Sequence, residues 1–161
     1  MWTQSYSHRI ANDQANANTN ADTNAKKIWD VWTDVNRWAE WQPDLERARI
    51  ERPFRAGTHF TLRPKGGPNV KVELLTVEPG VRYVDVTRFP LATMTGSHEL
   101  IANGEQLEIR TTMTVKGPLA FLWVRLVARG IVSGLPQQTR ALIERACGSG
   151  AKASKTEPAL S

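Results

Sequence analysis

The stretch GPLAFLWVRLVARGIVSGLPQQTRALIERAC (residues 117–147) holds the only long helical pattern in this chain, and it decides the fold. Its large apolar side chains can be gathered onto one side of a helix, with arginines elsewhere. They are Leu119, Leu122, Leu126, Leu135, Leu142 and Ile143. A helix this long needs a broad apolar surface to cover its stripe, so the sequence predicts a sheet packed along it. Gly130, Gly134 and Pro136 disfavour regular helix, and we expect a bend near residues 130–136.

The residues before this helix have the two-residue period of β-strands. Asn103-Gly104 is the clearest turn signal, because a type I′ hairpin needs positive φ at both central positions. Short separators predict neighbouring strands that run antiparallel as a meander. The predicted strands are 45–52, 58–64, 69–78, 81–89, 92–102 and 106–116, with a weaker first edge strand at 3–10. Sheet first and long helix last predicts an α+β fold, a curved antiparallel sheet of six to seven strands around the helix, which readily encloses a cavity.

The N-terminal part predicts a connection and two short helices. Residues 11–25 contain no large apolar side chain, so we expect an exposed Asn-rich connection over 11–24. Thr23 or Asn24 is the expected cap of a helix from Lys26 to about Val35, followed by a helical turn over 36–41. The small, polar residues 148–161 predict a disordered tail, which leaves one domain at 1–147.

Two stretches of the sequence also match motifs of a known protein superfamily. The run AKKIWDVWTDVNRWAEWQPDLERA (25–48) has an Ala-x-x-apolar-Trp turn, then Thr-Asp, Trp and Trp-x-Pro. The run VKGPLAFLWVRLVARGIVSGLPQQTRALIERA (115–146) has a strand, a Gly-Pro break and a long helix with a central Leu-Pro. Together they resemble the polyketide cyclase/dehydrase and START-like (SRPBCC) superfamily. The matching positions are Ala25, Ile28, Trp29, Thr33, Asp34, Trp38, Trp41, Pro43, Leu135 and Pro136.

The resemblance implies the helix-grip fold, with a deep hydrophobic pocket between the sheet and the C-terminal helix. One departure is the Asn-rich stretch after the first strand, which is usually shorter in that superfamily. Lipid carriers, hormone receptors, aromatase/cyclases and chaperone co-factors all share this fold, so the fold does not give the function.

Composition narrows the class of protein. The net charge is +5 and the pI about 9.7, but arginines alternate with acidic residues and form no dense tract, so we expect no nucleic-acid partner. The single Cys147 excludes an internal disulfide framework. Ligand-spaced groups of His, Asp and Glu are missing, so we expect no metal and no cofactor. There is no uncharged apolar run of membrane-spanning length and no secretory signal, so we expect a cytoplasmic protein without an integral membrane segment.

Two residues are candidates for catalysis, His98 and Arg88. His98 shares its strand parity with Met94, Gly96 and Leu100, so it is expected to face the pocket. It is interpreted either as a general acid/base or as a histidine hydrogen-bonded at the pocket wall. Arg88 could hold a carboxylate or phenolate if it reaches the pocket mouth. Its strand does not alternate cleanly, so Tyr83 could take the inward position instead.

The remaining histidines, His8 and His59, are expected on the surface. Trp38 and Trp41 are interpreted as a clasp that closes one end of the core, with pocket lining as the alternative. Strand parity and the helix stripe together predict which side chains converge on the ligand. The predicted ligand-binding residues are Trp38, Trp41, Phe60, Leu62, Val72, Val84, Arg88, Met94, His98, Thr111, Met113, Leu122 and Leu126.

These observations favour binding or carriage of a hydrophobic or amphipathic small molecule in an internal pocket. Such a function needs only an apolar cavity and a polar anchor. The alternative is an enzyme of the polyketide cyclase/dehydratase type, in which His98 and Arg88 direct an aldol or dehydration step. A third interpretation is a regulatory partner protein that uses the helix and loops as its interface. The sequence does not fix the ligand or the oligomeric state.

Overall fold

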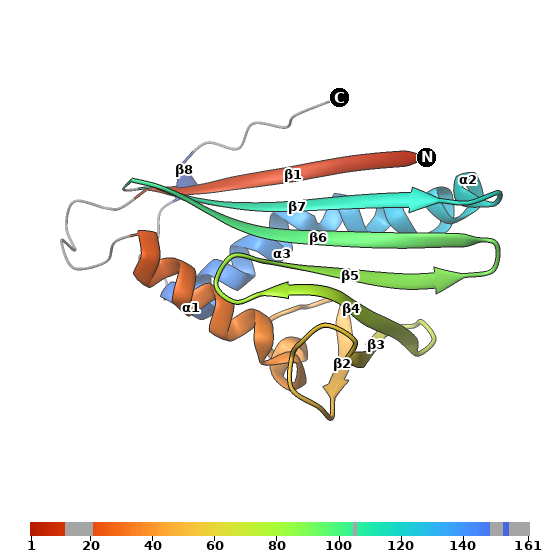
Figure 1. Cartoon of the computed structure of the whole chain (residues 1–161), viewed down its shortest axis with the longest axis horizontal. Helices are drawn as coiled ribbons and strands as arrows, with labels where there is room; N and C mark the ends of the chain where they lie inside the picture. Colours follow the sequence, from red (N-terminus) through yellow and green to blue (C-terminus); the bar gives the residue numbers. More distant parts are fainter. Residues whose placement is uncertain (12–20, 105, 149–152, 155–161) are drawn as a thin grey trace.

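The computed structural model describes residues 1–11, 21–104, 106–148 and 153–154, and it confirms the predicted helix-grip fold. One antiparallel sheet has the strand order β2-β3-β4-β5-β6-β7-β1-β8 (Figure 1). The strands are β1 (Trp2–Ala11), β2 (Leu45–Ile50), β3 (His59–Pro64), β4 (Val70–Glu78), β5 (Arg82–Phe89), β6 (Ala92–Asn103), β7 (Gln106–Lys116) and β8 (Ala153–Ser154). The helices are α1 (Ala21–Thr33), η1 (Val35–Glu40), α2 (Ala120–Trp123), η2 (Val124–Ala128) and α3 (Arg129–Cys147).

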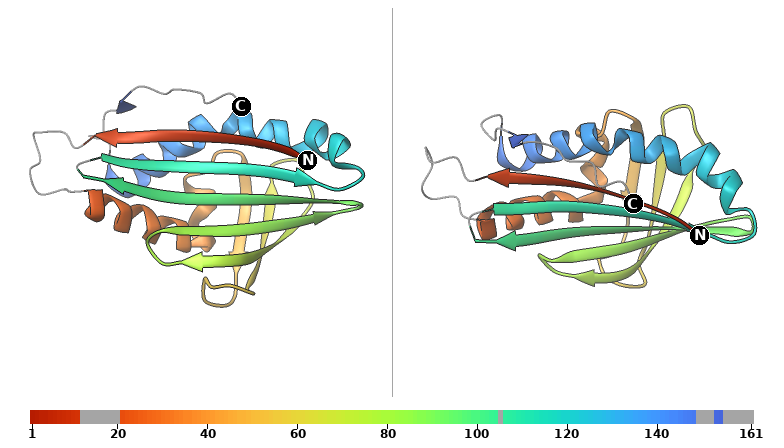
Figure 2. Two further views of the ribbon diagram at one scale, coloured as in Figure 1. Left: turned by 45° about the horizontal axis from the view of Figure 1, so that its top comes forward. Right: turned by 90° about the horizontal axis from the view of Figure 1, so that it is seen from above.

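The sheet is the predicted meander, and β1 pairs with β7 to complete it. β7 alternates as its sequence predicts: Leu107, Ile109, Thr111, Met113 and Val115 are buried and the residues between them are not. The long helix runs along one face of the curved sheet (Figure 2), and α1 packs against α3 on that side. The core therefore lies between this face and the two helices.

The helix that was expected from Lys26 begins at Ala21, so Thr23 and Asn24 lie inside it and do not cap it. Ala21, Asn24 and Ala25 are buried, and the Cys147 thiol of α3 lies 3.7 Å from the Asn24 side-chain oxygen. Packing against α3 therefore extends α1 into the Asn-rich segment, because tertiary burial outweighs local propensity. The rest of the predicted connection, residues 12–20, lies outside the described residues.

In the C-terminal tail, β8 pairs antiparallel with β1, so two residues of the segment expected to be disordered join the sheet. Residues 149–152 and 155–161 of that predicted tail lie outside the described residues. None of the helices in the described part of the chain is both long and apolar enough to cross a membrane.

The C-terminal helix is continuous through three segments, with π-helical hydrogen bonding over Val124–Ala128. Ala120, Val124 and Ala128 are the buried positions here, and they pack with Met94, Met113 and Val115. This four-residue spacing is longer than the 3.6 residues of an α-helical turn, and wider π turns accommodate it.

The predicted helix stripe is wrong at Leu122 and Leu126, which are exposed. The helix is apolar nearly all round in this part, so residue size misled the prediction. The helix residues that face the sheet are smaller than these leucines, and small side chains let the helix approach the sheet closely.

His8 is not a surface residue: it is 3% exposed, and its Nδ1 has no hydrogen-bond partner among the described residues. β1 lies next to β7, and α3 packs on it, so α3 covers the inward-facing side chains of β1. Burial lowers the pKa of His8 below its usual value of about 6.5, and the positive charge of Arg140 lowers this pKa further.

We expect this lowered pKa to make the protein less stable in mild acid. The unfolded chain binds a proton at His8 more readily than the folded protein does, so the free energy of unfolding falls as pH drops below about 6.5. The melting temperature should therefore fall more between pH 7 and pH 5 in the wild type than in His8→Gln, which cannot titrate. Identical pH profiles for the two proteins would contradict this expectation.

Candidate functional site

A cavity of about 140 Å³, partly open to solvent, lies between the sheet and the helices. Its wall comes from η1 and the residues after it, from the inward faces of β3 to β7, and from α1 and α3. The lining residues are Trp32, Trp38, Trp41, Gln42, Phe60, Leu62, Val72, Tyr83, Asp85, Thr87, Met94, His98, Ile109, Thr111, Met113, Ile131, Leu135, Gln138, Thr139 and Leu142. Aromatic and aliphatic side chains dominate, and a few polar groups lie among them. This is the usual composition of a small-molecule site.

Nine of the predicted ligand-binding residues lie on the wall of this cavity. They are Trp38, Trp41, Phe60, Leu62, Val72, Met94, His98, Thr111 and Met113. The structure thus brings together residues from η1, β3, β4, β6 and β7 that are far apart in the sequence. Their contact with a ligand stays a prediction.

Four of the predicted residues lie outside the cavity: Val84, Arg88, Leu122 and Leu126. Leu122 and Leu126 are exposed on the outer side of the helix. On β5 the cavity-facing residues are Tyr83, Asp85 and Thr87, so Val84 and Arg88 have the opposite parity. The Arg88 guanidinium pairs in solvent with the Glu73 carboxylate, and Tyr83 takes the inward position.

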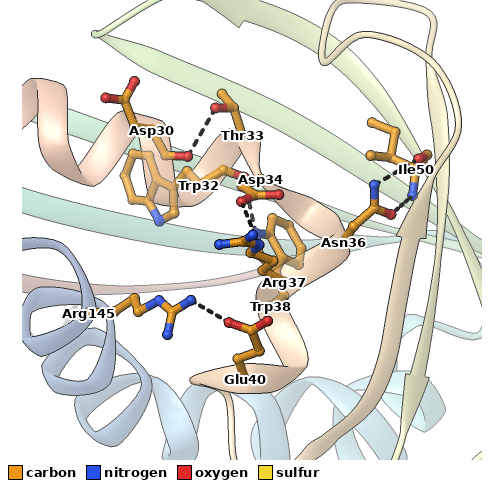
Figure 3. Close-up of polar contacts among 10 residues, drawn as sticks. All are labelled: Asp30, Trp32, Thr33, Asp34, Asn36, Arg37, Trp38, Glu40, Ile50 and Arg145. Carbon is orange, nitrogen blue, oxygen red and sulfur yellow. Dashed lines mark hydrogen bonds and ion pairs between the residues drawn. The ribbon is translucent and has the colours of Figure 1, made fainter.

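Polar contacts hold η1 in place at one end of the cavity (Figure 3). The Asn36 side chain bonds the backbone of Ile50 in β2 twice: its oxygen accepts from the N–H at 2.9 Å and its amide donates to the C=O at 3.2 Å. Glu40 pairs with Arg145 of α3. The indole of Trp38 donates to the carbonyl oxygen of Trp32 at 3.1 Å. That carbonyl belongs to the last turn of α1, where carbonyls lack helical partners, so Trp38 closes the helix end and also lines the cavity.

One polar part of the cavity wall is a His98–Asp85 pair. The His98 Nε2 lies 3.1 Å from the Asp85 Oδ2, and both side chains are mostly buried. A hydrogen bond from His98 to this carboxylate uses the tautomer with the proton on Nε2, and in that tautomer Nδ1 is an acceptor. The arrangement is that of a base oriented by a carboxylate.

Strand register explains how this pair forms. β5 and β6 are joined at Pro90-Leu91, and Phe89 pairs with Ala92, so Asp85 lies opposite Gly96 and Tyr83 opposite His98. A Cβ added at Gly96 would lie 3.0 Å from both the Asp85 Oδ1 and the His98 Nε2. Gly96 therefore leaves the space through which the two side chains meet along one face of the sheet.

Tyr83 supports the imidazole from the neighbouring strand. Its ring stacks on the His98 ring with centroids 4.4 Å apart, and it contacts the edge of Trp32 at 5.4 Å. Burial raises the pKa of the Tyr83 phenol well above its usual value, and the negative charge of Asp85 raises this pKa further. Tyr83 is therefore a neutral phenol throughout the physiological range.

Sequence reasoning missed Asp85 as a partner of His98. The available signal was the short Phe89-Pro90 turn, because a tight turn fixes the register and so the residues opposite one another. His59, expected on the surface, is exposed there and lies 3.7 Å from the Glu73 carboxylate. No group of three or more His, Cys, Asp and Glu side chains with metal-site geometry occurs in the described part of the chain.

A larger groove of about 790 Å³ lies on the surface over the ends of β2 and β3. Its walls include Arg47, Arg49, Arg52, Arg55 and His59. Charged and polar residues make up most of its lining, so this groove suits an apolar molecule less well than the inner cavity does.

Comparison with known proteins agrees with this architecture. The family model described as polyketide cyclase / dehydrase and lipid transport matches residues 15–146. The chain belongs to this family. No curated protein matches the chain significantly.

Several solved structures share the fold. Norcoclaurine synthase from Thalictrum flavum, solved with dopamine and hydroxybenzaldehyde, has 13% identity and a TM-score of 0.66, covering 94% of this chain and 89% of that one. The Zhui aromatase/cyclase from a Streptomyces species has 14% identity and a TM-score of 0.63, covering 94% and 99%. A START superfamily protein from Mycobacterium smegmatis has 14% identity and a TM-score of 0.60, covering 89% and 96%. At these identities the likeness concerns the fold alone.

Proposed function

We propose that this protein binds a hydrophobic or amphipathic small molecule in the inner cavity, with the His98–Asp85 pair as its polar anchor. The observation that carries the proposal is the cavity of about 140 Å³ between the sheet and α3. An apolar cavity of roughly 150 Å³ holds one benzene ring. The ligand, or the part of it that enters the cavity, is therefore about one ring in size.

A buried hydrogen-bond donor on the cavity wall favours an amphipathic ligand over a hydrocarbon. Trp41 lines the cavity, and its indole N–H is buried without a hydrogen-bond partner among the described residues. Leaving a buried donor unpaired costs about 1–3 kcal/mol. A ligand oxygen would accept from the Trp41 indole, or a ligand hydroxyl would donate to Nδ1 of His98, while the ring of the ligand contacts Phe60 and Met113.

Titration with hydroxybenzaldehyde, the single-ring compound in the norcoclaurine synthase structure, tests this proposal. Thr139 is a buried lining residue of α3, and Thr139→Phe places a ring in the cavity. We expect calorimetry to detect binding to the wild type and at least tenfold weaker binding to Thr139→Phe. Phe121→Ser, on the outer side of the helix, is the control and should bind as the wild type does. Native mass spectrometry of freshly purified protein would identify any retained ligand.

A second candidate function is catalysis, and the His98–Asp85 pair is the observation that favours it. A proton carrier in an enzyme needs a second group that orients it, and Asp85 meets this need at 3.1 Å. In a reaction of the cyclase/dehydratase kind, Nδ1 of His98 would take a proton from a carbon next to a carbonyl. Asp85 would stabilise the resulting imidazolium. The same ring would return the proton to a departing hydroxyl.

A further inference from the structure

One end of the molecule exposes large apolar side chains that the fold does not use. Phe121 is 73% exposed, Leu126 64% and Leu91 65%, and Leu122 is also exposed. We call this set, Leu91, Phe121, Leu122 and Leu126, the apolar end surface. Arg125 and Arg129 lie on the same exposed side of the helix. Contiguous exposed apolar side chains of this size usually mark an interaction site.

Hydrogen bonds and a ring contact join the two elements that carry this surface. The backbone N–H of Leu119, just before α2, donates to the carbonyl of Leu91 at 3.1 Å. The indole of Trp123 donates to the Pro90 carbonyl at 3.0 Å and stacks on Phe89 with ring centroids 4.3 Å apart. Both figures place α2 and the β5–β6 turn at the same end of the sheet (Figures 1 and 2). These contacts hold the start of the helix, which carries Phe121 and Leu122, against the turn that carries Leu91.

The backbone at this patch holds Leu91 in an unusual conformation. Its φ is 55°, in the left-handed region that branched and bulky residues rarely adopt. Gly117 packs so closely on it that an added Cβ would lie 2.5 Å from the Leu91 carbonyl oxygen. A glycine would fit position 91 without strain, and the Leu91 side chain is mostly in solvent. Its presence there points to a partner outside the protein.

The charge around the patch has one sign. Residues 86–98 and 109–143 contain no Asp or Glu, while Lys116, Arg125 and Arg129 lie in the second of these stretches. Arg125 and Arg129 form no ion pair with any residue that the structure describes. This helix face therefore combines exposed Phe and Leu side chains with arginines that have no ion-pair partner among the described residues, beside a half-buried Trp. Such a combination is typical of a helix that lies on a lipid surface.

We propose that the apolar end surface docks the protein on anionic lipid bilayers. Phe121, Leu126 and Leu91 enter the interface, and Arg125 and Arg129 meet the lipid phosphates. A second copy of this chain fits less well, because a two-fold contact through the patch would bring the same arginines of both copies together. This docking goes beyond ligand binding in the cavity and does not depend on it.

Co-sedimentation with vesicles tests the proposal. The wild type should bind vesicles that contain phosphatidylglycerol and phosphatidylcholine, and bind pure phosphatidylcholine far less. Phe121→Ser/Leu126→Ser should weaken partitioning at least about tenfold, because both side chains enter the interface. Arg125→Glu/Arg129→Glu should weaken it roughly 30-fold or more, since each basic residue at an anionic surface contributes a factor of about five.

Two matched controls distinguish docking from general stickiness. Leu75→Ser/Val81→Ser removes two exposed apolar side chains elsewhere. Arg52→Glu/Arg55→Glu makes the same change of net charge in the open groove. Both controls should bind as the wild type does, and all variants should keep the wild-type melting temperature within a few degrees. No binding by the wild type, or equal loss in the Arg52/Arg55 control, would overturn the proposal. So would a wild-type dimer that the Phe121/Leu126 variant dissociates.

Discussion

Replacing Trp38 by alanine is expected to lower the free energy of unfolding by about 3–5 kcal/mol, the usual loss for a buried tryptophan. Trp38 is buried, and its ring meets the edge of Phe60 with centroids 5.4 Å apart. Its indole is also the hydrogen-bond donor to the Trp32 carbonyl at the end of α1. The substitution would enlarge the cavity, remove this packing and leave a buried carbonyl without its donor.

Two further variants separate these contributions. Trp38→Phe keeps much of the ring packing but cannot donate to Trp32, so it should cost less, about 1–3 kcal/mol. Phe121→Ala removes an aromatic side chain of the exposed end surface and should change stability by less than about 0.5 kcal/mol. Urea unfolding measures all three. A Trp38→Ala loss no greater than that of Phe121→Ala would show that η1 is not part of the cooperative core.

The sequence was most informative where one face of an element is plainly apolar and the other plainly polar. β7 alternates without exception from Leu107 to Val115, so its inward residues, Thr111 and Met113 among them, could be predicted. The order of sheet and helix and the turn at Asn103-Gly104 are equally local signals. They sufficed to predict a curved antiparallel sheet around a long C-terminal helix, and the superfamily resemblance implied the helix-grip fold.

Prediction was weaker where a segment is apolar on all sides or polar throughout. In residues 119–128 nearly every position is apolar, and only the sheet decides that Val124 faces inward and Leu126 outward. The Asn-rich start of α1 gives no helical signal, and its packing against α3 decides the boundary. β5 alternates poorly, so the choice between Tyr83 and Arg88 as the inward residue needed the β5–β6 register.

The His98–Asp85 pair shows how a functional hypothesis can change when register becomes known. From sequence, His98 had no partner, and a single proton carrier favoured binding over catalysis. Gly96 lies between them on β6, and its missing side chain lets a carboxylate of β5 reach the imidazole. Binding requires only a hydrogen bond from His98, whereas proton transfer requires its imidazole to gain and lose a proton.

Substitution of His98 by glutamine is expected to separate the two functions. Glutamine can keep a hydrogen bond to Asp85 but cannot carry a proton at neutral pH. If the protein only binds its ligand, His98→Gln should weaken affinity for hydroxybenzaldehyde by about 0.5–1.5 kcal/mol, the net contribution of one neutral hydrogen bond. If His98 moves a proton, turnover of a converted compound should fall by roughly 10²–10⁴-fold with binding largely retained. We expect the first result, because ligand binding needs only an apolar cavity and a polar anchor.

Two other variants complete this experiment. Arg88→Ala removes the second catalytic candidate, which lies outside the cavity paired with Glu73, and should change neither affinity nor turnover. Gly96→Ala should disturb the His98–Asp85 pair without touching either residue, because its Cβ would come within 3.0 Å of both side chains. Ligand titration and product analysis by mass spectrometry would be run on all four proteins. Conversion by the wild type and Arg88→Ala but not by His98→Gln or Gly96→Ala would establish catalysis, since only a proton-transfer step needs the oriented imidazole while binding persists.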